Sequence, residues 1–392
     1  MKGSFKMKVT DVKTFVVDCF RTNWVFVKVY TDEGIDGVGE ATLEYKEKAL
    51  LGAVEHIKEY LVGEDPRDIE RHFHSIYRDA YWRGGPVLMS ALSAVETALW
   101  DILGKSLGVP VYRLLGGKVN EKVRIYVNGW FAGAKEPEEF GEKAKEAVKR
   151  GVTAFKWDPF GKSYLEISNR DLDRAMRCVA AVRDAVGNDA DILIEGHGRF
   201  NIPTGIKIAR ELEQFRPMFF EEPVPPDNLD ALKAVKDKSP VAISAGERLY
   251  TRWDYKRMFD LMAADYIQPD ISHAGGIMEL KKIAAEAECR YIPFAPHNPS
   301  GPVANAATLQ LAATCPNFCI LEIMYSDVEW RKDVTNESLE YADGYMKIPD
   351  RPGLGIEIDE EACLSHPYKP HTLRHYTGAL TDIRPAKTEF YF

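Results

Sequence analysis

The sequence has few of the features that mark membrane-bound, secreted or nucleic-acid-binding proteins. None of its apolar runs approaches the ~20 residues that a membrane-spanning helix needs. The basic residues 1–8 have no apolar stretch behind them, so they do not resemble a secretory signal. The formal net charge of −9 offers no attraction to a nucleic acid. We therefore expect a cytoplasmic protein that has neither a membrane nor a nucleic acid as a partner.

Cysteine is also scarce, and its six residues are scattered. No two of them form a CxxC pair, and Cys315 and Cys319 are the closest neighbours. We interpret both as small buried residues, with a metal-binding or redox role as the less favoured alternative. This distribution fits a reduced, cytosolic protein. Internal repeats and low-complexity tracts are not evident, and a chain that is 45% hydrophobic and 28% charged is typical of a globular protein.

The length of 392 residues predicts two domains. Residues 9–20, 24–31 and 35–42 are rich in β-branched and aromatic side chains and predict three strands. The pattern turns helical from residue 46 to residue 115. We assign residues 1–120 to an α+β capping domain. The Pro-rich residues 346–392 are too few to fold alone, and we expect them to pack back onto this domain.

Between residues 121 and 345, short apolar runs alternate with amphipathic helical segments. We predict eight strands, at residues 123–127, 154–157, 192–195, 218–221, 241–244, 266–268, 291–294 and 319–322. Strict alternation of strands and helices predicts a parallel sheet, and eight units predict its closure into an α/β barrel of the TIM type.

Three glutamates stand at the ends of successive predicted strands. Glu195, Glu221 and Glu247 are each separated from the next by 26 residues, about one strand-and-helix unit of a barrel that spends ~250 residues on eight units. A helix cap or a surface ion pair would explain one such residue but not three at equal spacing. Convergent carboxylates repel one another unless a cation neutralises them, and an all-oxygen ligand set favours Mg²⁺ over zinc.

Two histidines follow barrel strands. His197 lies two residues after Glu195, on the same face, where it would point toward the metal-bound substrate. His297 follows the seventh predicted strand, and Asp270 ends the sixth, so the carboxylate could orient the imidazole as a general base. The alternative interpretation is that these are unrelated residues of the barrel rim.

Other polar residues are weaker candidates. Lys156 interrupts an apolar strand and could be a second acid or base or a partner for a bound carboxylate, unless it only extends to the rim. Glu322 ends the eighth strand and could bind a substrate oxygen. In the cap, two stretches combine aromatic and cationic residues that either bind substrate or contact the barrel. The candidates for substrate contact are Arg21, Trp24, Trp82 and Arg83, with Arg199 and Trp330 as weaker ones.

Several motifs place these residues in a known family. They are residues 94–102 (AVETALWDI), 220–224 (FEEPV), 245–248 (AGER), 268–270 (QPD), 273–277 (HAGGI) and 295–297 (APH). With them the chain resembles the enolase superfamily, in its mandelate racemase/muconate lactonizing enzyme branch, and most of all the galactonate dehydratase family of acid-sugar dehydratases. The resemblance implies a modified (β/α)₇β barrel covered by an N-terminal α+β cap that the C-terminal tail completes.

The resemblance also implies roles. Glu195, Glu221 and Glu247 match the Mg²⁺ ligands, His297 and Asp270 match the base pair, and His197 matches the acid that expels hydroxide. Glu322 matches a substrate contact on the eighth strand. Two departures stand out, because the first ligand is more often Asp, and the racemases carry a Lys-x-Lys pair where this chain has Lys156 and Asp158. The missing lysine argues against racemisation.

The expected reaction is therefore Mg²⁺-dependent dehydration of a galactonate- or gluconate-like acid to a 2-keto-3-deoxy acid. His297 would remove the α-proton and His197 would protonate the departing 3-hydroxyl. Epimerisation or cycloisomerisation of a sugar acid on the same site is the nearest alternative, and a barrel that only binds ligands is a third. The family further implies a homo-oligomer, from dimer to octamer.

Overall fold

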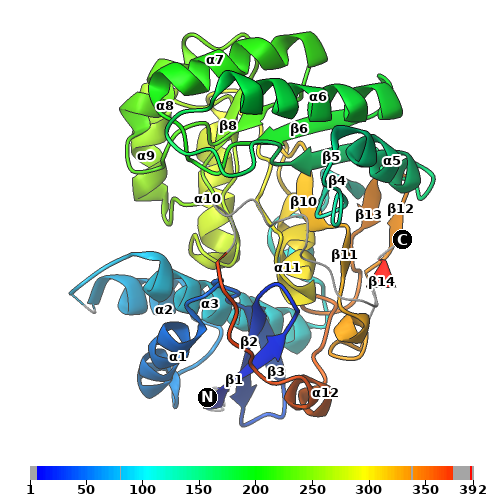
Figure 1. The fold of residues 1–392 in the computed structure, drawn as a ribbon. Helices are drawn as coiled ribbons and strands as arrows, with labels where there is room; N and C mark the ends of the chain where they lie inside the picture. The colour runs from blue at the N-terminus through cyan, green and yellow to red at the C-terminus, as the bar shows by residue number, and fades with distance from the viewer. Residues whose placement is uncertain (1–6, 80, 337–338, 374–388, 391–392) are drawn as a thin grey trace.

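A computed structural model describes residues 7–79, 81–336, 339–373 and 389–390. Two bodies are visible in Figure 1. The N-terminal elements form a cap at the bottom of the view, and the green and yellow elements above it form the barrel.

The cap is an antiparallel sheet with helices packed against it. Its strands β1 (Val9–Asp18), β2 (Asn23–Thr31) and β3 (Asp36–Glu40) pair in chain order. The helical elements are α1 (Glu47–Leu61), α2 (Ile69–His74), the π-helical turn η1 (Ser75–Asp79), α3 (Pro86–Leu107) and α4 (Val111–Leu114). Gly39 lets β3 lie directly on α3, because a Cβ atom there would overlap the backbone of Ala94.

Helix α3 is the core helix of the cap. It is long and apolar enough to meet the length and hydropathy criterion for a membrane span, although the sequence contains no uninterrupted apolar run of that length. Its most apolar 18-residue window is 83% buried inside the protein, where it packs against β2, β3 and α1. Among the described residues this is the one helix that meets the criterion, and its burial accounts for its composition.

The barrel strands are parallel and follow the chain around a closed ring. They are β4 (Lys122–Asn128), β5 (Ala154–Trp157), β6 (Asp191–Glu195), β7 (Phe220–Glu221), β8 (Ile243–Ala245), β9 (Tyr266–Ile267) and β10 (Leu321–Met324). Pairing of β10 with β4 closes the ring. The predicted seventh strand is reduced to single bridges from Phe294 to Ile267 and to Phe318.

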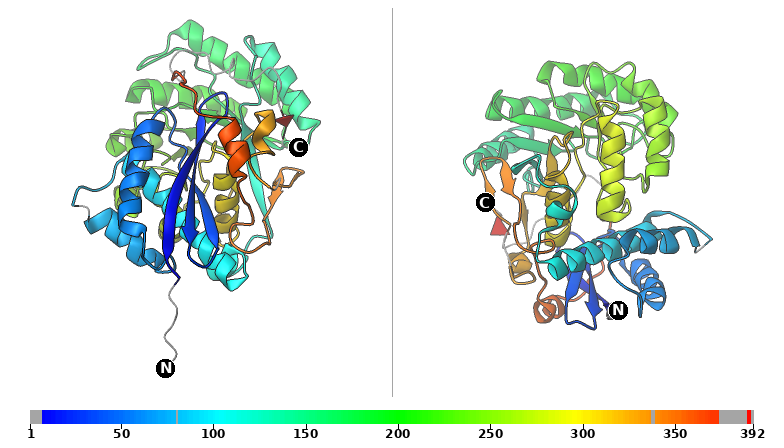
Figure 2. Two further views of the ribbon diagram at one scale, coloured as in Figure 1. Left: turned by 90° about the horizontal axis from the view of Figure 1, so that it is seen from below. Right: turned by 180° about the vertical axis from the view of Figure 1, so that it is seen from behind.

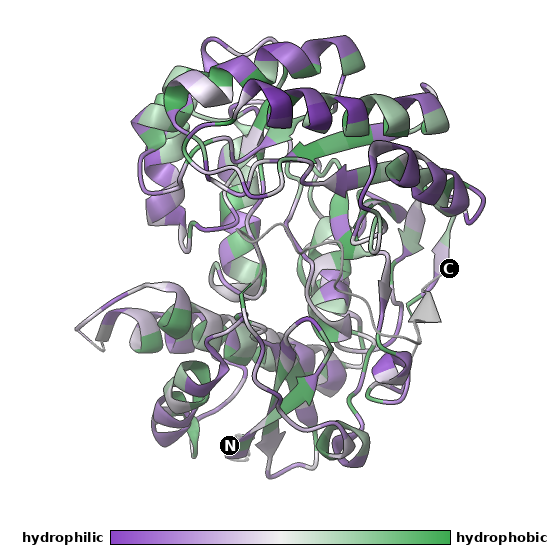
Figure 3. Cartoon of the chain, viewed as in Figure 1, coloured by the Kyte–Doolittle hydropathy of each residue, from purple (hydrophilic) through white to green (hydrophobic). Residues whose placement is uncertain are grey.

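Helices cover the outside of the ring. They are α5 (Pro137–Val148), α6 (Asn169–Val186), α7 (Ile202–Leu212) with the 3₁₀ turn η2 (Glu213–Phe215), α8 (Leu229–Lys236), α9 (Arg252–Leu261), α10 (Gly276–Glu288) and α11 (Pro302–Ala312). Figure 3 shows hydrophilic residues along the outer faces of α6 and α7 and hydrophobic ones on the strands beneath. The apolar stripe of each helix is therefore buried against the sheet.

The C-terminal segment runs along the barrel and then returns to the cap. Its elements are β11 (Ser326–Asp327), the 3₁₀ turn η3 (Glu329–Arg331), β12 (Tyr341–Ala342), β13 (Tyr345–Lys347), α12 (Glu360–Ser365) and β14 (Glu389–Phe390). Strand β13 pairs with β4, whereas α12 packs against β1 of the cap (Figure 2). The carboxylate of Glu360 lies 2.9 Å from the ammonium of Lys28 on β2.

Candidate active site

The interior of the barrel changes from apolar to charged toward the C-terminal ends of its strands. Successive inward-facing positions lie two residues apart. Four such pairs lie on barrel strands or begin one residue before them, namely Ala154 and Lys156, Leu193 and Glu195, Phe219 and Glu221, and Ile320 and Glu322. The lower layer forms a small apolar cluster of its own, so the charged groups above it are held on a dry, rigid base.

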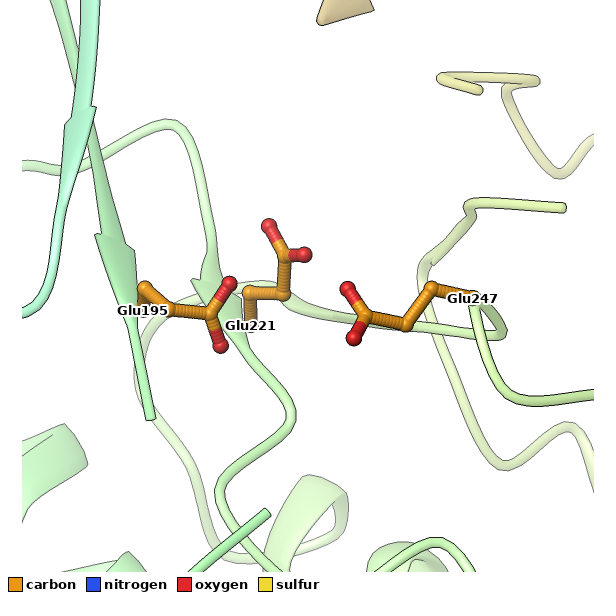
Figure 4. Close-up of side chains that lie close together, drawn as sticks. All are labelled: Glu195, Glu221 and Glu247. Carbon is orange, nitrogen blue, oxygen red and sulfur yellow. The ribbon is translucent and has the colours of Figure 1, made fainter. Parts of the chain in front are cut away.

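The three equally spaced glutamates converge at this charged level (Figure 4). Glu195, Glu221 and Glu247 each offer a carboxylate oxygen within 4.8 Å of the other two. Burial raises the pKa of Glu221 well above its usual value, and the charge of Glu195 raises it further. A donor set of three carboxylates without nitrogen or sulfur suits a hard divalent cation that keeps some of its water ligands. These residues could therefore hold a metal ion.

Lys156 lies inside the same cluster. Its Nζ atom is 2.9 Å from Glu221 Oε1, 3.2 Å from Glu195 Oε2 and 2.9 Å from Glu322 Oε1. Burial alone would lower the pKa of this ammonium, but the surrounding carboxylates raise it well above the usual value. Lys156 is therefore a fixed positive charge at the floor of the site.

His297 and Asp270 form a hydrogen-bonded pair at the rim. The Nδ1 atom of His297 donates to Asp270 Oδ2 at 2.7 Å, and the other oxygen of Asp270 accepts from the backbone N–H of Ser272. The Nε2 atom lies 3.4 Å from Glu247. Burial lowers the pKa of His297, but Glu247 and Asp270 outweigh this and raise it to about 10. The pair therefore presents Nε2 toward the carboxylate cluster.

A second histidine–aspartate pair was not predicted from the sequence. The Nδ1 atom of His197 donates to Asp158 Oδ2 at 2.7 Å, and the backbone N–H of His197 donates to Glu195 at 2.6 Å. His197 has a φ of +50°, in the left-handed region that residues other than glycine rarely adopt. Asp158 could have been selected from the sequence by its spacing, because a residue two positions after Lys156 lies on the same side of an extended strand.

Arg199 binds the Asp158 carboxylate of this second pair. Both carboxylate oxygens of Asp158 lie 2.7 Å from Arg199 Nη2, and the guanidinium also donates to the backbone oxygens of Gly161 and Gly196. Arg199 is fully buried and is not among the residues that line the cleft, so the expected substrate contact is replaced by a structural one. Burial raises the pKa of Asp158, but His197 and Arg199 outweigh this and hold it below the usual value.

Asp158→Asn should destabilise the fold by about 3 kcal/mol, because it leaves the buried Arg199 without its counter-charge. The difference from the wild type should shrink as the pH falls through the lowered pKa of Asp158, since protonation removes the same charge. Urea unfolding at several pH values measures both effects. Asp237→Asn, which breaks an exposed pair with Lys233, is the control and should cost under about 1 kcal/mol. A loss no larger than that of the control would contradict the assignment.

Above these groups lies a cleft of about 450 Å³ between barrel and cap. Its barrel side includes Lys156, Asp158, Glu195, His197, Glu247 and His297. The cap contributes Arg21, residues 42–46 and Pro86, and the tail contributes Leu373. Residues that sequence analysis did not select also line the cleft, among them Tyr45, Lys46, Arg248, Tyr250 and His273. Tyr45 and Lys46 precede α1 in the cap, whereas Arg248, Tyr250 and His273 lie on loops that follow the barrel strands β8 and β9.

Of the cap residues predicted to contact substrate, the structure places only some at the cleft. Arg21 lines the cleft, where its guanidinium contacts Glu44 and the backbone oxygen of Pro299. Trp24 is 0% exposed and lies beside Gly301, outside the residues that line the cleft. Trp82 is 79% exposed, and it and Arg83 lie outside the residues that line the cleft. Arg83 instead sits 6.0 Å from the centre of the Tyr77 ring.

Trp330 also makes a structural contact, donating from Nε1 to the backbone oxygen of Asp18 and stacking on His366.

Comparison with known families agrees with this geometry. Residues 6–116 match the mandelate racemase/muconate lactonizing enzyme N-terminal domain, and residues 139–362 match the enolase C-terminal domain-like family. The chain belongs to the mandelate racemase/muconate lactonizing enzyme branch of the enolase superfamily. Membership in this branch confirms the predicted fold class, a capped α/β barrel.

Individual members of the branch are similar over most of their length. A D-galactonate dehydratase of Pectobacterium atrosepticum is 37% identical over 91% of this chain and 94% of its own. A D-gluconate dehydratase of Thermoproteus tenax is 36% identical over 88% of this chain and 70% of its own. The crystal structure of an enolase superfamily member from Salmonella Typhimurium superposes with a TM-score of 0.88 at 34% identity, covering 92% of this chain and 98% of that one.

Proposed function

We propose that the protein is an acid-sugar dehydratase, a hydro-lyase that converts a galactonate- or gluconate-like aldonic acid to a 2-keto-3-deoxy acid. The observation that carries this proposal is the presence of two histidine–aspartate pairs on one cleft, His297 with Asp270 and His197 with Asp158. Dehydration needs one group to remove a proton and another to supply one. Relatives named D-galactonate and D-gluconate dehydratase at 36–38% identity support the substrate class.

Glu195, Glu221 and Glu247 would hold Mg²⁺ in this proposal, and the oxygen-only donor set supports that choice. When bound, the cation would supply positive charge next to the substrate carboxylate, where negative charge develops as the α-proton leaves. Lys156 adds a second, permanent positive charge at the floor. In this proposal the reacting carbon would lie at the barrel rim, between the floor and the cap.

His297 would remove the proton from C2 of the substrate. Asp270 accepts the Nδ1 hydrogen, so the Nε2 lone pair of the neutral imidazole is directed toward the cleft. The same contact stabilises the imidazolium that forms after transfer. Glu247 and Asp270 raise the pKa of His297, so its neutral imidazole is a stronger base than that of a free histidine. His297 would act from this neutral form, which becomes more populated as the pH rises toward that pKa.

His197 would deliver a proton to the departing 3-hydroxyl. Burial lowers its pKa, but Glu195 and Asp158 outweigh this and raise it, so the protonated imidazole is favoured more than in a free histidine. The hydrogen bond to Asp158 engages Nδ1, so the proton that His197 would donate is the one on Nε2. Loss of water would leave an enol that ketonises to the 2-keto-3-deoxy acid.

Epimerisation or cycloisomerisation would require a second acid or base, and Lys156 is the candidate from the sequence. Three carboxylates engage its ammonium and raise its pKa, which weighs against its acting as a base. Dehydration remains the reaction that the geometry supports best.

The test is a screen of purified protein with Mg²⁺ against aldonic and uronic acids, run in D₂O. Semicarbazide detects 2-keto-3-deoxy acids, and NMR detects deuterium at C2. Product formation on an aldonic acid supports the proposal and identifies the substrate. Exchange at C2 without loss of water would favour an epimerase or a cycloisomerase. Absence of exchange on every acid would overturn the substrate class.

Arg21→Ala should raise KM for the substrate by about tenfold, because Arg21 lines the cleft and offers charged donors to substrate oxygens. Arg83→Ala is the matched control, since its guanidinium lies outside the cleft lining, and its KM should stay within about twofold of the wild-type value. Steady-state kinetics on the two variants measure both KM values. Equal KM values for Arg21→Ala and wild type would remove Arg21 from the substrate site.

A further inference from the structure

Two barrel helices begin differently from their neighbours. Helices α6, α7, α8 and α9 each start with a residue whose side chain accepts a backbone N–H of the first turn, namely Ser168, Asn201, Asn228 and Thr251. Helices α10 and α11 start at Gly275 and Gly301, which offer no side-chain cap. The first N–H groups of a helix need acceptors, so those of α10 and α11 must find them elsewhere.

Glu96 of the cap supplies the acceptors for α10. Its Oε2 accepts from the N–H of Ile277 at 2.7 Å, and its Oε1 accepts from Met278 at 3.0 Å and from Trp100 Nε1 at 2.8 Å. The side chain is buried, and it accepts hydrogen bonds from these three N–H groups. Gly276 permits this approach, because a Cβ atom there would overlap the Glu96 carboxylate.

The same face of α3 holds the segment that precedes α10. Ser93, one turn before Glu96, accepts from the N–H of Gly275 at 2.8 Å. Ser90, a further turn back, lies 2.8 Å from His273 Nδ1. This segment begins three residues after Asp270. Helix α3 therefore makes hydrogen bonds to the connection between Asp270 and α10.

Glu40 of the cap does the same for α11. Its carboxylate accepts from the N–H groups of Gly301 at 2.6 Å and Ala304 at 2.8 Å. Gly301 follows His297 by four residues, and residues 299 and 300 between them line the cleft. Glu40 also ends β3, two residues before the segment 42–46, which lines the cleft from the cap side. Figure 1 shows α10 and α11 on the side of the barrel that faces the cap.

We propose that Glu96 and Glu40 are positioning residues. By binding the N-termini of α10 and α11, they fix Asp270 and His297 relative to the cap, so that the two side chains reach their catalytic positions only when the cap is docked on the barrel. The inference rests on the proposed function, in which His297 and Asp270 act as the base. Each half of the pair is followed by a helix whose N-terminus is completed by the other domain. Misplacement of a catalytic group by about 1 Å can cost 10²-fold in rate, so the anchoring affects turnover more than binding.

The test compares Glu96→Gln and Glu40→Gln with Asn228→Ala. Glutamine keeps the size of the side chain but turns an NH₂ group toward a backbone N–H. Asn228→Ala removes the cap of α8, a helix that caps itself. We expect each glutamine variant to lower kcat by at least tenfold with KM within about threefold, and the control to keep kcat within about twofold. A kcat loss no greater than that of the control would overturn the proposal.

Two further measurements separate this inference from the proposed reaction. Amide hydrogen exchange needs no substrate, and residues 270–278 and 297–304 should lose protection in the glutamine variants but not in Asn228→Ala. Unchanged protection would overturn the proposal even if the wild type proves to be a dehydratase. Lost protection would support the anchoring even if the wild type turns over no sugar acid. Ser93→Ala, a milder change on the same face, gives the same readout for α10 if Glu96→Gln does not fold.

Discussion

His297→Asn is expected to lower kcat by about 10³-fold and to leave KM within a few-fold of the wild-type value. Asparagine can still donate a hydrogen bond to Asp270, so the local structure should persist. It cannot accept a proton, so the step that it abolishes is abstraction at C2. The exchange of the C2 hydrogen with D₂O should therefore disappear together with dehydration.

His197→Asn is the informative comparison for that result. It should also reduce dehydration, because the 3-hydroxyl would leave without a proton. Exchange at C2 should survive, since His297 and Asp270 are intact in this variant. The ratio of exchange to dehydration, measured by NMR on one sample, then assigns the two histidines. If His297→Asn kept C2 exchange and His197→Asn lost it, the two roles would be reversed.

Removal of Mg²⁺ should abolish turnover and also lower the thermal unfolding temperature. Glu195, Glu221 and Glu247 lie within 4.8 Å of one another and are buried or half-buried, so a cation between them relieves their mutual repulsion. Saturation at 100 times the dissociation constant stabilises a protein by about 2.7 kcal/mol. Unfolding temperature as a function of Mg²⁺ concentration measures this effect without any substrate.

Glu221→Gln should remove both the activity and the dependence of unfolding temperature on Mg²⁺. Glu222→Gln is the matched control, because Glu222 is buried next to Glu221 but pairs with Arg248 instead of joining the cluster. It should keep the Mg²⁺ dependence. A Glu221→Gln variant that is still stabilised by Mg²⁺ to the wild-type extent would place the metal elsewhere.

The barrel could be predicted from the sequence because the patterns that indicate its strands and helices are local. The apolar runs before Glu195 and Glu221 mark strand ends, and an even spacing of 26 residues marks repeated units. Parallel strands then bring their carboxyl ends to one rim whatever the details of packing. The seventh strand was predicted too long, since residues 291–294 form bridges at Phe294 alone. Edges of an element are set by neighbours that local patterns do not contain.

The cap residues that line the cleft could not be predicted in the same way. Trp24, Trp82 and Arg83 were chosen because aromatic and cationic residues often bind substrates, yet Trp24 is internal and the other two lie outside the cleft. Which cap residues face the barrel depends on how the two bodies dock. That docking rests on contacts between residues far apart in the sequence, such as Glu96 with Ile277.

The return of α12 to the cap has a consequence for how the chain folds as it is made. Lys28 on β2 and its partner Glu360 are 332 positions apart. At roughly 5–20 residues per second, ribosomes deliver Glu360 about 15 to 70 seconds after Lys28. The cap strands are therefore made before the barrel, but α12 reaches them only after all the barrel strands have been made. During that interval the exposed edge of β1 and the apolar face that α12 later covers are open to other chains, so this is where we expect chaperones to act on the nascent protein.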